Sequence, residues 1–159
     1  MGQEIERKFL VTGEGWRTGR RTTIRQGYLS VEAERTVRVR TKEDHTAANA
    51  HAYLTIKGKT EGTARAEYEY EIPLADANEL LDHLCLRPLI EKNRYTLDYE
   101  GMTWEVDEFF GENQGLVLAE IELEETAQSF ANPPWLGEEV SHDARYFNAS
   151  LTQHPYTAW

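Results

Sequence analysis

One short segment near the start of the chain sets the pattern of the whole fold: residues 3–11 read QEIERKFLV. Successive side chains of a β-strand point to opposite faces, so Glu4, Glu6 and Lys8 share one face and Ile5 lies on the other. The segment therefore predicts a strand with one apolar face and one charged face.

The same alternation recurs along the chain. Arg38 and Arg40 share a face opposite Val39, and Lys92 and Arg94 share a face in the same way. Glutamates at every second position form acidic rows at 67–71 and 120–124. Segments of this kind, separated by Gly, Pro, Asp and Asn, predict eight strands, at residues 3–11, 22–31, 35–41, 51–58, 65–73, 88–99, 102–109 and 116–124.

Other segments depart from the strand pattern. Residues 75–84 place apolar side chains at helical spacing and predict an amphipathic helix, residues 143–151 predict a second helix, and residues 16–20 predict a short third one. The polar, Ala-rich residues 42–50 predict a loop. Because the chain is close to the common domain size and contains no repeat, we predict a single domain over residues 1–159.

The charged rows are sorted by sign, and this decides between two architectures. Each strand taken alone is typical of an antiparallel sheet with one solvated face. Such a face normally mixes both signs, whereas here acidic and basic strands are separate. Eight antiparallel strands can close a barrel whose interior holds side chains or one small ligand. We therefore predict a mainly β (α+β) fold, an antiparallel eight-stranded β-barrel tunnel with charges inside and flanking helices covering its outer apolar faces.

The composition excludes several classes of protein. The chain has 28 acidic and 17 basic side chains and a net charge of -11, which repels nucleic-acid phosphates at long range. No apolar stretch approaches the ~20 residues of a membrane span, and the charged start of the chain is unlike a secretory signal. The single cysteine, Cys85, cannot form an internal disulfide. We expect a cytoplasmic protein with neither nucleic-acid nor membrane partners.

A family resemblance follows from the same residues. The segment EIERKFL at 4–10 resembles the ExExK signature of the CYTH domain, or triphosphate tunnel metalloenzyme, superfamily, and it is most similar to the compact bacterial inorganic triphosphatases. Matching blocks follow in family order at 26–29 (QGYL), 37–40 (VRVR), 53–58 (YLTIKG), 65–73 (RAEYEYEIP), 91–95 (EKNRY), 104–109 (WEVDEF), 119–124 (AEIELE) and 137–151 (GEEVSHDARYFNASL). The fold of that family, a charged eight-stranded tunnel, agrees with the architecture inferred from alternation.

The resemblance implies roles for the matching charged residues. The metal-binding positions are Glu4, Glu6, Glu69, Asp107, Glu120 and Glu122. The phosphate-binding positions are Lys8, Arg38, Arg40, Lys57, Lys92, Arg94 and Arg145, of which Lys8 and Arg40 are also assigned to catalysis. Ligation by oxygen alone favours the hard cations Mg²⁺ or Mn²⁺ over zinc. Without a cation, converging carboxylates repel one another, so replacing Glu120 and Glu122 by Gln is predicted to stabilise the metal-free protein.

The implied reaction is metal-dependent hydrolysis of a triphosphate, foremost inorganic tripolyphosphate to pyrophosphate and phosphate. Within the family, a class IV adenylyl cyclase and a nucleoside or thiamine triphosphatase stay open as alternatives. Outside enzymes, a non-catalytic polyphosphate-binding module would keep the basic rows but would not need both carboxylate pairs. The expected partner is a small polyphosphate, and a homodimer is left open.

Overall fold

A computed structural model describes residues 2–45 and 49–159 of the protein. Within these residues ten antiparallel strands form one sheet with the order β10-β1-β9-β8-β7-β2-β3-β4-β6, and β5 pairs with β1. The strands are β1 (Glu4–Val11), β2 (Arg20–Glu32), β3 (Arg35–Asp44), β4 (Asn49–Gly58), β5 (Ala64–Arg65), β6 (Glu67–Ile72), β7 (Ile90–Tyr99), β8 (Met102–Phe109), β9 (Val117–Glu122) and β10 (Leu136–Glu139).

All eight predicted strands are present, with two additions. The predicted strand at 65–73 is divided into β5, which pairs with β1, and β6, which pairs with β4. Strand β10, which the alternation did not reveal, pairs with the end of β1. It is only four residues long, too short to show a period of two clearly.

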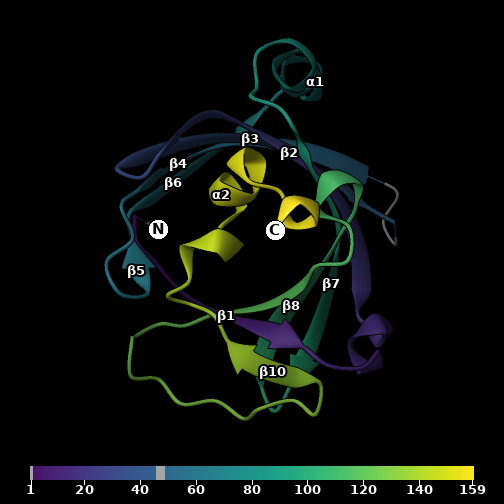
Figure 1. Cartoon of the computed structure of the whole chain (residues 1–159), viewed down its shortest axis with the longest axis vertical. Helices are drawn as coiled ribbons and strands as arrows, with labels where there is room; N and C mark the ends of the chain where they lie inside the picture. The colour runs from purple at the N-terminus through teal and green to yellow at the C-terminus, as the bar shows by residue number, and fades with distance from the viewer. Residues whose placement is uncertain (1, 46–48) are drawn as a thin grey trace.

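The strands curl round a common interior (Figure 1), which is the predicted tunnel architecture. Strands β6 and β10 are the two ends of the strand order, so the ladders among the described residues do not close the sheet completely. Strand β5 bridges the opening, because Glu4 pairs with Arg65 and Ile5 with Ala64. One further backbone hydrogen bond, from Glu67 N to Gly2 O at 3.3 Å, joins β6 to the start of the chain.

The loop predicted at 42–50 is wrong at both of its ends. Strand β3 continues to Asp44 and β4 begins at Asn49, and these two residues are paired. The ladder extends through polar residues because its hydrogen bonds use the backbone, whatever the side chain. Residues 46–48 lie outside the described residues.

Helix α1 (Leu74–His83) confirms the helix predicted at 75–84 and covers the outer face of β3 and β4. Its Ala77 and Leu81 are buried against Val39 and Ala52 in one apolar cluster. The 3-10 helix η1 (Gly15–Thr18) replaces the short helix predicted at 16–20. Among the described residues, none of the helices has the length and apolar character that a membrane span requires.

The C-terminal helix was expected on the outside of the barrel, and this prediction is wrong. After the 3-10 helix η3 (Ala144–Tyr146), α2 (Asn148–Gln153) packs against the inner face of β2 and β7, and it lies inside the curve of the strands in Figure 1. Its Leu151 is fully buried with Ile90 and Leu118, which continue the inward rows of β7 and β9. Apolar residues at one end of the tunnel therefore receive the helix, while charged residues fill the rest.

The remaining outer apolar surface, on β1, β8 and β9, is covered by irregular chain. Trp104 of β8 makes edge contacts with Phe9, Phe130 and Trp135, and the last two lie in the long connection from β9 to β10. Aromatic pairs in this edge-to-face geometry add to the stabilisation from area burial. The outward apolar face of the strands thus forms the main core, and the charged face is left for the interior.

Candidate active site

A cavity of about 450 Å³ lies in the tunnel. Its wall combines residues of all the strands from β1 to β9 with residues of the connection 59–63 and of the segment 141–150. The residues predicted for the site that line this cavity are Glu4, Glu6, Lys8, Arg38, Arg40, Lys57, Glu69, Lys92, Arg94, Glu120 and Glu122. The alternative of a flat, solvated charged face is therefore wrong for these rows, because they line one common cavity.

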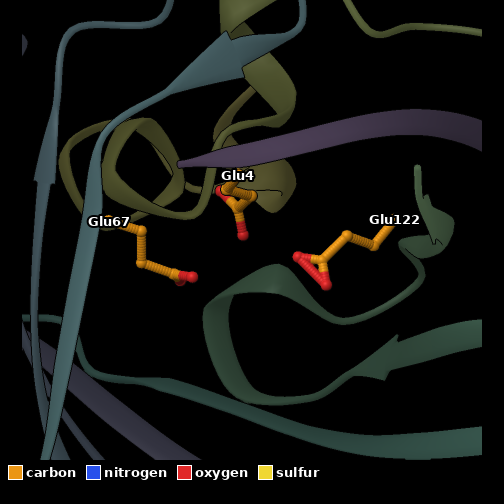
Figure 2. A group of neighbouring side chains, drawn as sticks. All are labelled: Glu4, Glu67 and Glu122. Carbon is orange, nitrogen blue, oxygen red and sulfur yellow. The ribbon is translucent and has the colours of Figure 1, made fainter. Parts of the chain in front are cut away.

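Three carboxylates from three different strands converge at one side of the cavity. Glu4 of β1, Glu67 of β6 and Glu122 of β9 each direct an oxygen to a common region, and these atoms lie within 4.8 Å of one another (Figure 2). A set of carboxylate oxygens with no nitrogen or sulfur donor fits Mg²⁺ or Mn²⁺. Glu4 and Glu122 were predicted as metal ligands, whereas Glu67 was not.

Lysine and arginine hold this carboxylate group in place. Lys57 Nζ lies 2.9 Å from Glu4 Oε1 and 3.5 Å from Glu67 Oε2, and Arg65 Nε lies 3.5 Å from Glu4 Oε1. Burial alone would raise the pKa of Glu4, but Lys57 and Arg65 lower it below its ordinary value. For Glu122 the balance is the reverse: burial and then Glu4 and Glu67 raise its pKa, and the opposing effect of Lys57 is smaller. Ionised Glu122 is thus the carboxylate with most to gain from a bound cation.

Glu6 and Glu120, also predicted as metal ligands, lie on either side of Lys8. Lys8 Nζ lies 2.9 Å from Glu120 Oε1 and 3.1 Å from Glu6 Oε1. Burial and the neighbouring carboxylate of Glu120 raise the pKa of Glu6 to about 8. Burial would also raise the pKa of Glu120, yet Lys8 and a hydrogen bond with Glu6 hold it well below the ordinary value. At neutral pH these groups form a protonated Glu6, an ionised Glu120 and an ammonium between them.

Four of the cations predicted to bind phosphate line the cavity on β3 and β7, namely Arg38, Arg40, Lys92 and Arg94. Two of them are supported by Asp107 of β8, a residue predicted near the metals. Its carboxylate lies 2.8 Å from Lys92 Nζ and accepts two hydrogen bonds from Arg94. Asp107 is fully buried and is not among the residues that line the cavity. It lies behind the four cations Arg38, Arg40, Lys92 and Arg94, here called the cation wall.

The other two cations have weaker support. Arg40 Nε donates to Gln26 Oε1 at 2.7 Å, and burial followed by Arg38 and Arg94 lowers the pKa of Arg40. Arg38 Nη2 donates to Thr55 Oγ1 at 3.2 Å, while Arg38 Nε is buried without a hydrogen-bond partner. A buried donor without an acceptor is costly, and adjacent cations repel. This part of the cavity is therefore suited to an anion with several oxygens.

Glu69 and Arg145 complete the predicted set. Glu69 lines the cavity, accepts from Thr55 Oγ1 at 2.9 Å and lies 3.6 Å from Arg38 Nη2. Arg145 does not line the cavity, because its exposed side chain pairs with Asp143 at 2.7 Å. The phosphate contact assigned to Arg145 stays a prediction, although its neighbour Ala144 is part of the cavity wall.

Sequence reasoning missed several residues of the cavity wall. Glu67, Lys42 and Glu105 each lie two residues from a predicted site residue on the same strand, so the period of two was the signal that could have found them. Asn148 and the nearby Gln26 carry no charge and belong to no charged row. Only the packing of α2 against β2 brings these two side chains together, at 3.1 Å.

The cavity has an acidic side and a basic side. The carboxylate group of Glu4, Glu67 and Glu122 suits a divalent cation, and the cation wall suits oxygens of an anion. A phosphate chain with a divalent cation on its oxygens satisfies both sides at once. Such a site can polarise phosphorus for attack by water.

Known proteins resemble this chain over nearly its full length. The model of the CYTH domain family matches residues 2–156. The inorganic triphosphatase of Acetivibrio thermocellus is 49% identical over 157 residues, which is 98% of this chain and 97% of that protein. The inorganic triphosphatase of Nitrosomonas europaea is 36% identical over 151 residues, 93% of this chain and 95% of that protein. The crystal structure of the inorganic triphosphatase NE1496 superposes with a TM-score of 0.61 at 34% identity, covering 93% of this chain and 96% of that one. With its tunnel fold and its opposed charged walls, the chain belongs to the CYTH domain family.

Proposed function

We propose that this protein is a metal-dependent triphosphatase that hydrolyses inorganic tripolyphosphate to pyrophosphate and phosphate. One observation carries the proposal: a single cavity places the carboxylates of Glu4, Glu67 and Glu122 together with a wall of buried cations. Two relatives named as inorganic triphosphatases, each matched over more than nine-tenths of both chains, support the same activity.

Glu4, Glu67 and Glu122 would hold the divalent cation, Mg²⁺ or Mn²⁺. The fit rests on their chemistry, because three carboxylate oxygens in reach of one another are hard ligands. A divalent cation supplies charge neutralisation and Lewis acidity at the phosphate oxygens. The pKa of Glu122 is raised by burial and by Glu4 and Glu67 despite the opposing effect of Lys57, so its carboxylate gains most from the cation.

Arg38, Arg40, Lys92 and Arg94 would bind the phosphate chain. Guanidinium groups offer paired N–H donors that match phosphate oxygens, and ammonium groups act as point charges. In hydrolysis, negative charge spreads over the oxygens of the transferred phosphoryl group, so donors already in place stabilise the transition state. We assign catalysis to Arg40 in this wall and to Lys8, which lies at the centre of the Glu6 and Glu120 carboxyl groups.

We further infer that residues 1–159 act as one domain in the cytoplasm, on a free polyphosphate. The net charge of -11 supports a substrate other than nucleic acid, and the single Cys85 suits a reducing compartment. The residues assigned here all belong to one chain, and a homodimer stays a prediction.

The test measures release of phosphate and pyrophosphate from tripolyphosphate, ATP, thiamine triphosphate and pyrophosphate, with Mg²⁺, with Mn²⁺ and with chelator. We expect the highest rate on tripolyphosphate, none in chelator, and a low rate on pyrophosphate, which is too short to reach several cations and the carboxylate group together. Cyclic AMP from ATP would indicate a cyclase, and a preference for ATP or thiamine triphosphate would indicate the corresponding triphosphatase. Binding of tripolyphosphate without turnover would indicate a binding module.

A further inference from the structure

Two neutral amides lie among the charged groups at the end of the cavity where α2 enters. Asn148, the first residue of α2, accepts hydrogen bonds at its Oδ1 from Lys92 Nζ and from Gln26 Nε2, each at 3.1 Å. The other end of the Gln26 amide, Oε1, accepts from Arg40 Nε at 2.7 Å. Gln26 and Asn148, here called the amide bridge, thus connect a cation of β3 to a cation of β7.

The two amides differ in kind from the other partners of these cations. Lys92 also pairs with Asp107, a carboxylate, which neutralises positive charge as well as orienting it. An amide oxygen accepts a hydrogen bond but carries no net charge. It therefore satisfies a buried N–H and fixes its direction while leaving the positive charge available to a phosphate oxygen.

Burial makes this distinction important. Lys92 and Gln26 are almost completely inaccessible to solvent, so the loss of an acceptor leaves a buried donor unsatisfied. Burial, followed by repulsion from Arg38 and Arg94, lowers the pKa of Arg40. A neutral acceptor such as Gln26 Oε1 orients this guanidinium without adding a further charge beside it. The amide bridge supplies the orientation from α2, an element distant in sequence from the basic strands.

We propose that Asn148 and Gln26 are positioning residues of the active site, which hold Lys92 and Arg40 in register for one phosphate chain through neutral hydrogen-bond acceptors. This inference rests on the proposed function and extends it, because it makes the C-terminal helix a part of the substrate-binding apparatus. The amides act through the two cations and need not touch the substrate.

The sharpest variant is Asn148→Asp. Aspartate keeps the acceptor oxygens but places a negative charge beside Lys92, and an acidic residue in the first turn of a helix is favourable. We expect the melting temperature of this variant to equal or exceed that of the parent. Its kcat/KM for tripolyphosphate should fall by roughly 10-fold or more, mainly through KM, because the added charge competes with phosphate.

A second pair of variants tests the connection between the two amides. Asn148→Ala and Gln26→Leu each remove one residue of the bridge, and with it two of the three hydrogen bonds, so each should lower kcat/KM by roughly 10-fold. If the links act as one bridge, the double variant should lose little more than the worse single variant. Independent effects would instead multiply, to roughly 100-fold.

Two matched controls lie on the same helix. The buried Thr152 donates its hydroxyl to the Asn148 backbone oxygen at 3.4 Å, so Thr152→Val should lower the melting temperature and leave kcat/KM near that of the parent. Gln153 is exposed, and Gln153→Ala should change neither quantity. A purely structural role of Asn148 would make its variants behave like Thr152→Val.

Calorimetric binding of tripolyphosphate in metal-free buffer accompanies the kinetics, because it reports on the cations without turnover. Weaker binding by Asn148→Asp at an unchanged or higher melting temperature supports the proposal. Binding and kcat/KM both within about threefold of the parent for Asn148→Asp, or multiplying effects in the double variant, would overturn it and leave the proposed function intact. A parent that binds tripolyphosphate without hydrolysing it would overturn the proposed function, while the binding constants would still decide the role of the amides.

Discussion

Arg94 holds the buried carboxylate of Asp107 through two parallel hydrogen bonds, from Nε to Oδ1 at 2.8 Å and from Nη2 to Oδ2 at 2.9 Å. This two-pronged geometry is the strong form of an ion pair between a guanidinium and a carboxylate. Burial would raise the pKa of Asp107, but Arg94 and then Lys92 lower it to about 2. Asp107 therefore supports the cation row of β7 from behind the cavity.

Asp107→Asn should destabilise the protein by about 3–5 kcal/mol at pH 7, because it leaves buried cations without a counter-charge. Asp107 titrates below its ordinary pKa in the folded state, so its contribution is present above about pH 4 and is lost as the pH falls towards 2. We expect a loss of about 2 kcal/mol over that window in the parent. Urea unfolding from pH 2 to pH 7 measures both effects.

The exposed Asp98 of the neighbouring strand β7 is the control for this measurement. Asp98→Asn should change the unfolding free energy by less than about 0.5 kcal/mol at any of these pH values. If Asp107→Asn were as mild as Asp98→Asn, the ion pairs behind the cavity would not support the fold.

Glu120 and Glu122 should respond to replacement in opposite directions, which revises the sequence-based prediction that replacing both by Gln stabilises the metal-free protein, because Glu120 pairs with buried Lys8. Glu122→Gln removes a carboxylate whose pKa is raised by burial and by Glu4 and Glu67, so the metal-free protein should become more stable at pH 7. The gain should be less than about 1 kcal/mol, because this side chain is exposed enough for solvent to screen it. Glu120→Gln should cost about 3 kcal/mol, since it removes the ionised partner of buried Lys8. Thermal melting in chelator compares the two variants. If both melting temperatures shifted equally in the same direction, the different roles of Glu120 and Glu122 would be contradicted.

Glu67 should contribute to the response to magnesium. If Glu67 is a ligand beside Glu4 and Glu122, added Mg²⁺ should raise the melting temperature of the parent by mass action and that of Glu67→Gln much less. Glu71, on the same strand, is exposed, pairs with His51 and does not line the cavity. Glu71→Gln should therefore keep the full magnesium response. If Glu67→Gln and Glu71→Gln both kept the full magnesium response, Glu67 would not be a ligand of the cation.

Arg40→Ala should lower kcat/KM for tripolyphosphate by the equivalent of roughly 2–4 kcal/mol of transition-state stabilisation, if its guanidinium acts on developing charge. Arg21 is an exposed arginine of β2, so Arg21→Ala should leave turnover unchanged. Steady-state kinetics on both variants, with circular dichroism to confirm folding, makes the comparison. Near-normal turnover by folded Arg40→Ala would remove Arg40 from the catalytic assignment.

The sequence alone determined which face of each strand carries charge. Alternation is a local property of an extended backbone, so QEIERKFLV and the row of Arg38 and Arg40 identify cavity-facing side chains without knowledge of any partner strand. The same local signal predicted all eight strands that surround the tunnel. It failed where no period of two was available, as in the short β10 and in the neutral amides of Gln26 and Asn148.

Only the tertiary structure decided which charges meet. Glu4, Glu67 and Glu122 come from three strands far apart in the sequence, and their convergence depends on strand register and on the curvature of the sheet. The same register pairs Lys8 of β1 directly with Glu120 of β9, so the predicted metal ligand Glu120 is also the ion-pair partner of Lys8. A period of two specifies a face but not a neighbour, because neighbours across strands are set by long-range backbone pairing. The position of α2 inside the tunnel likewise depends on apolar burial of Leu151 against Ile90 and Leu118. These residues are far apart in the sequence, so no local pattern could predict the contact.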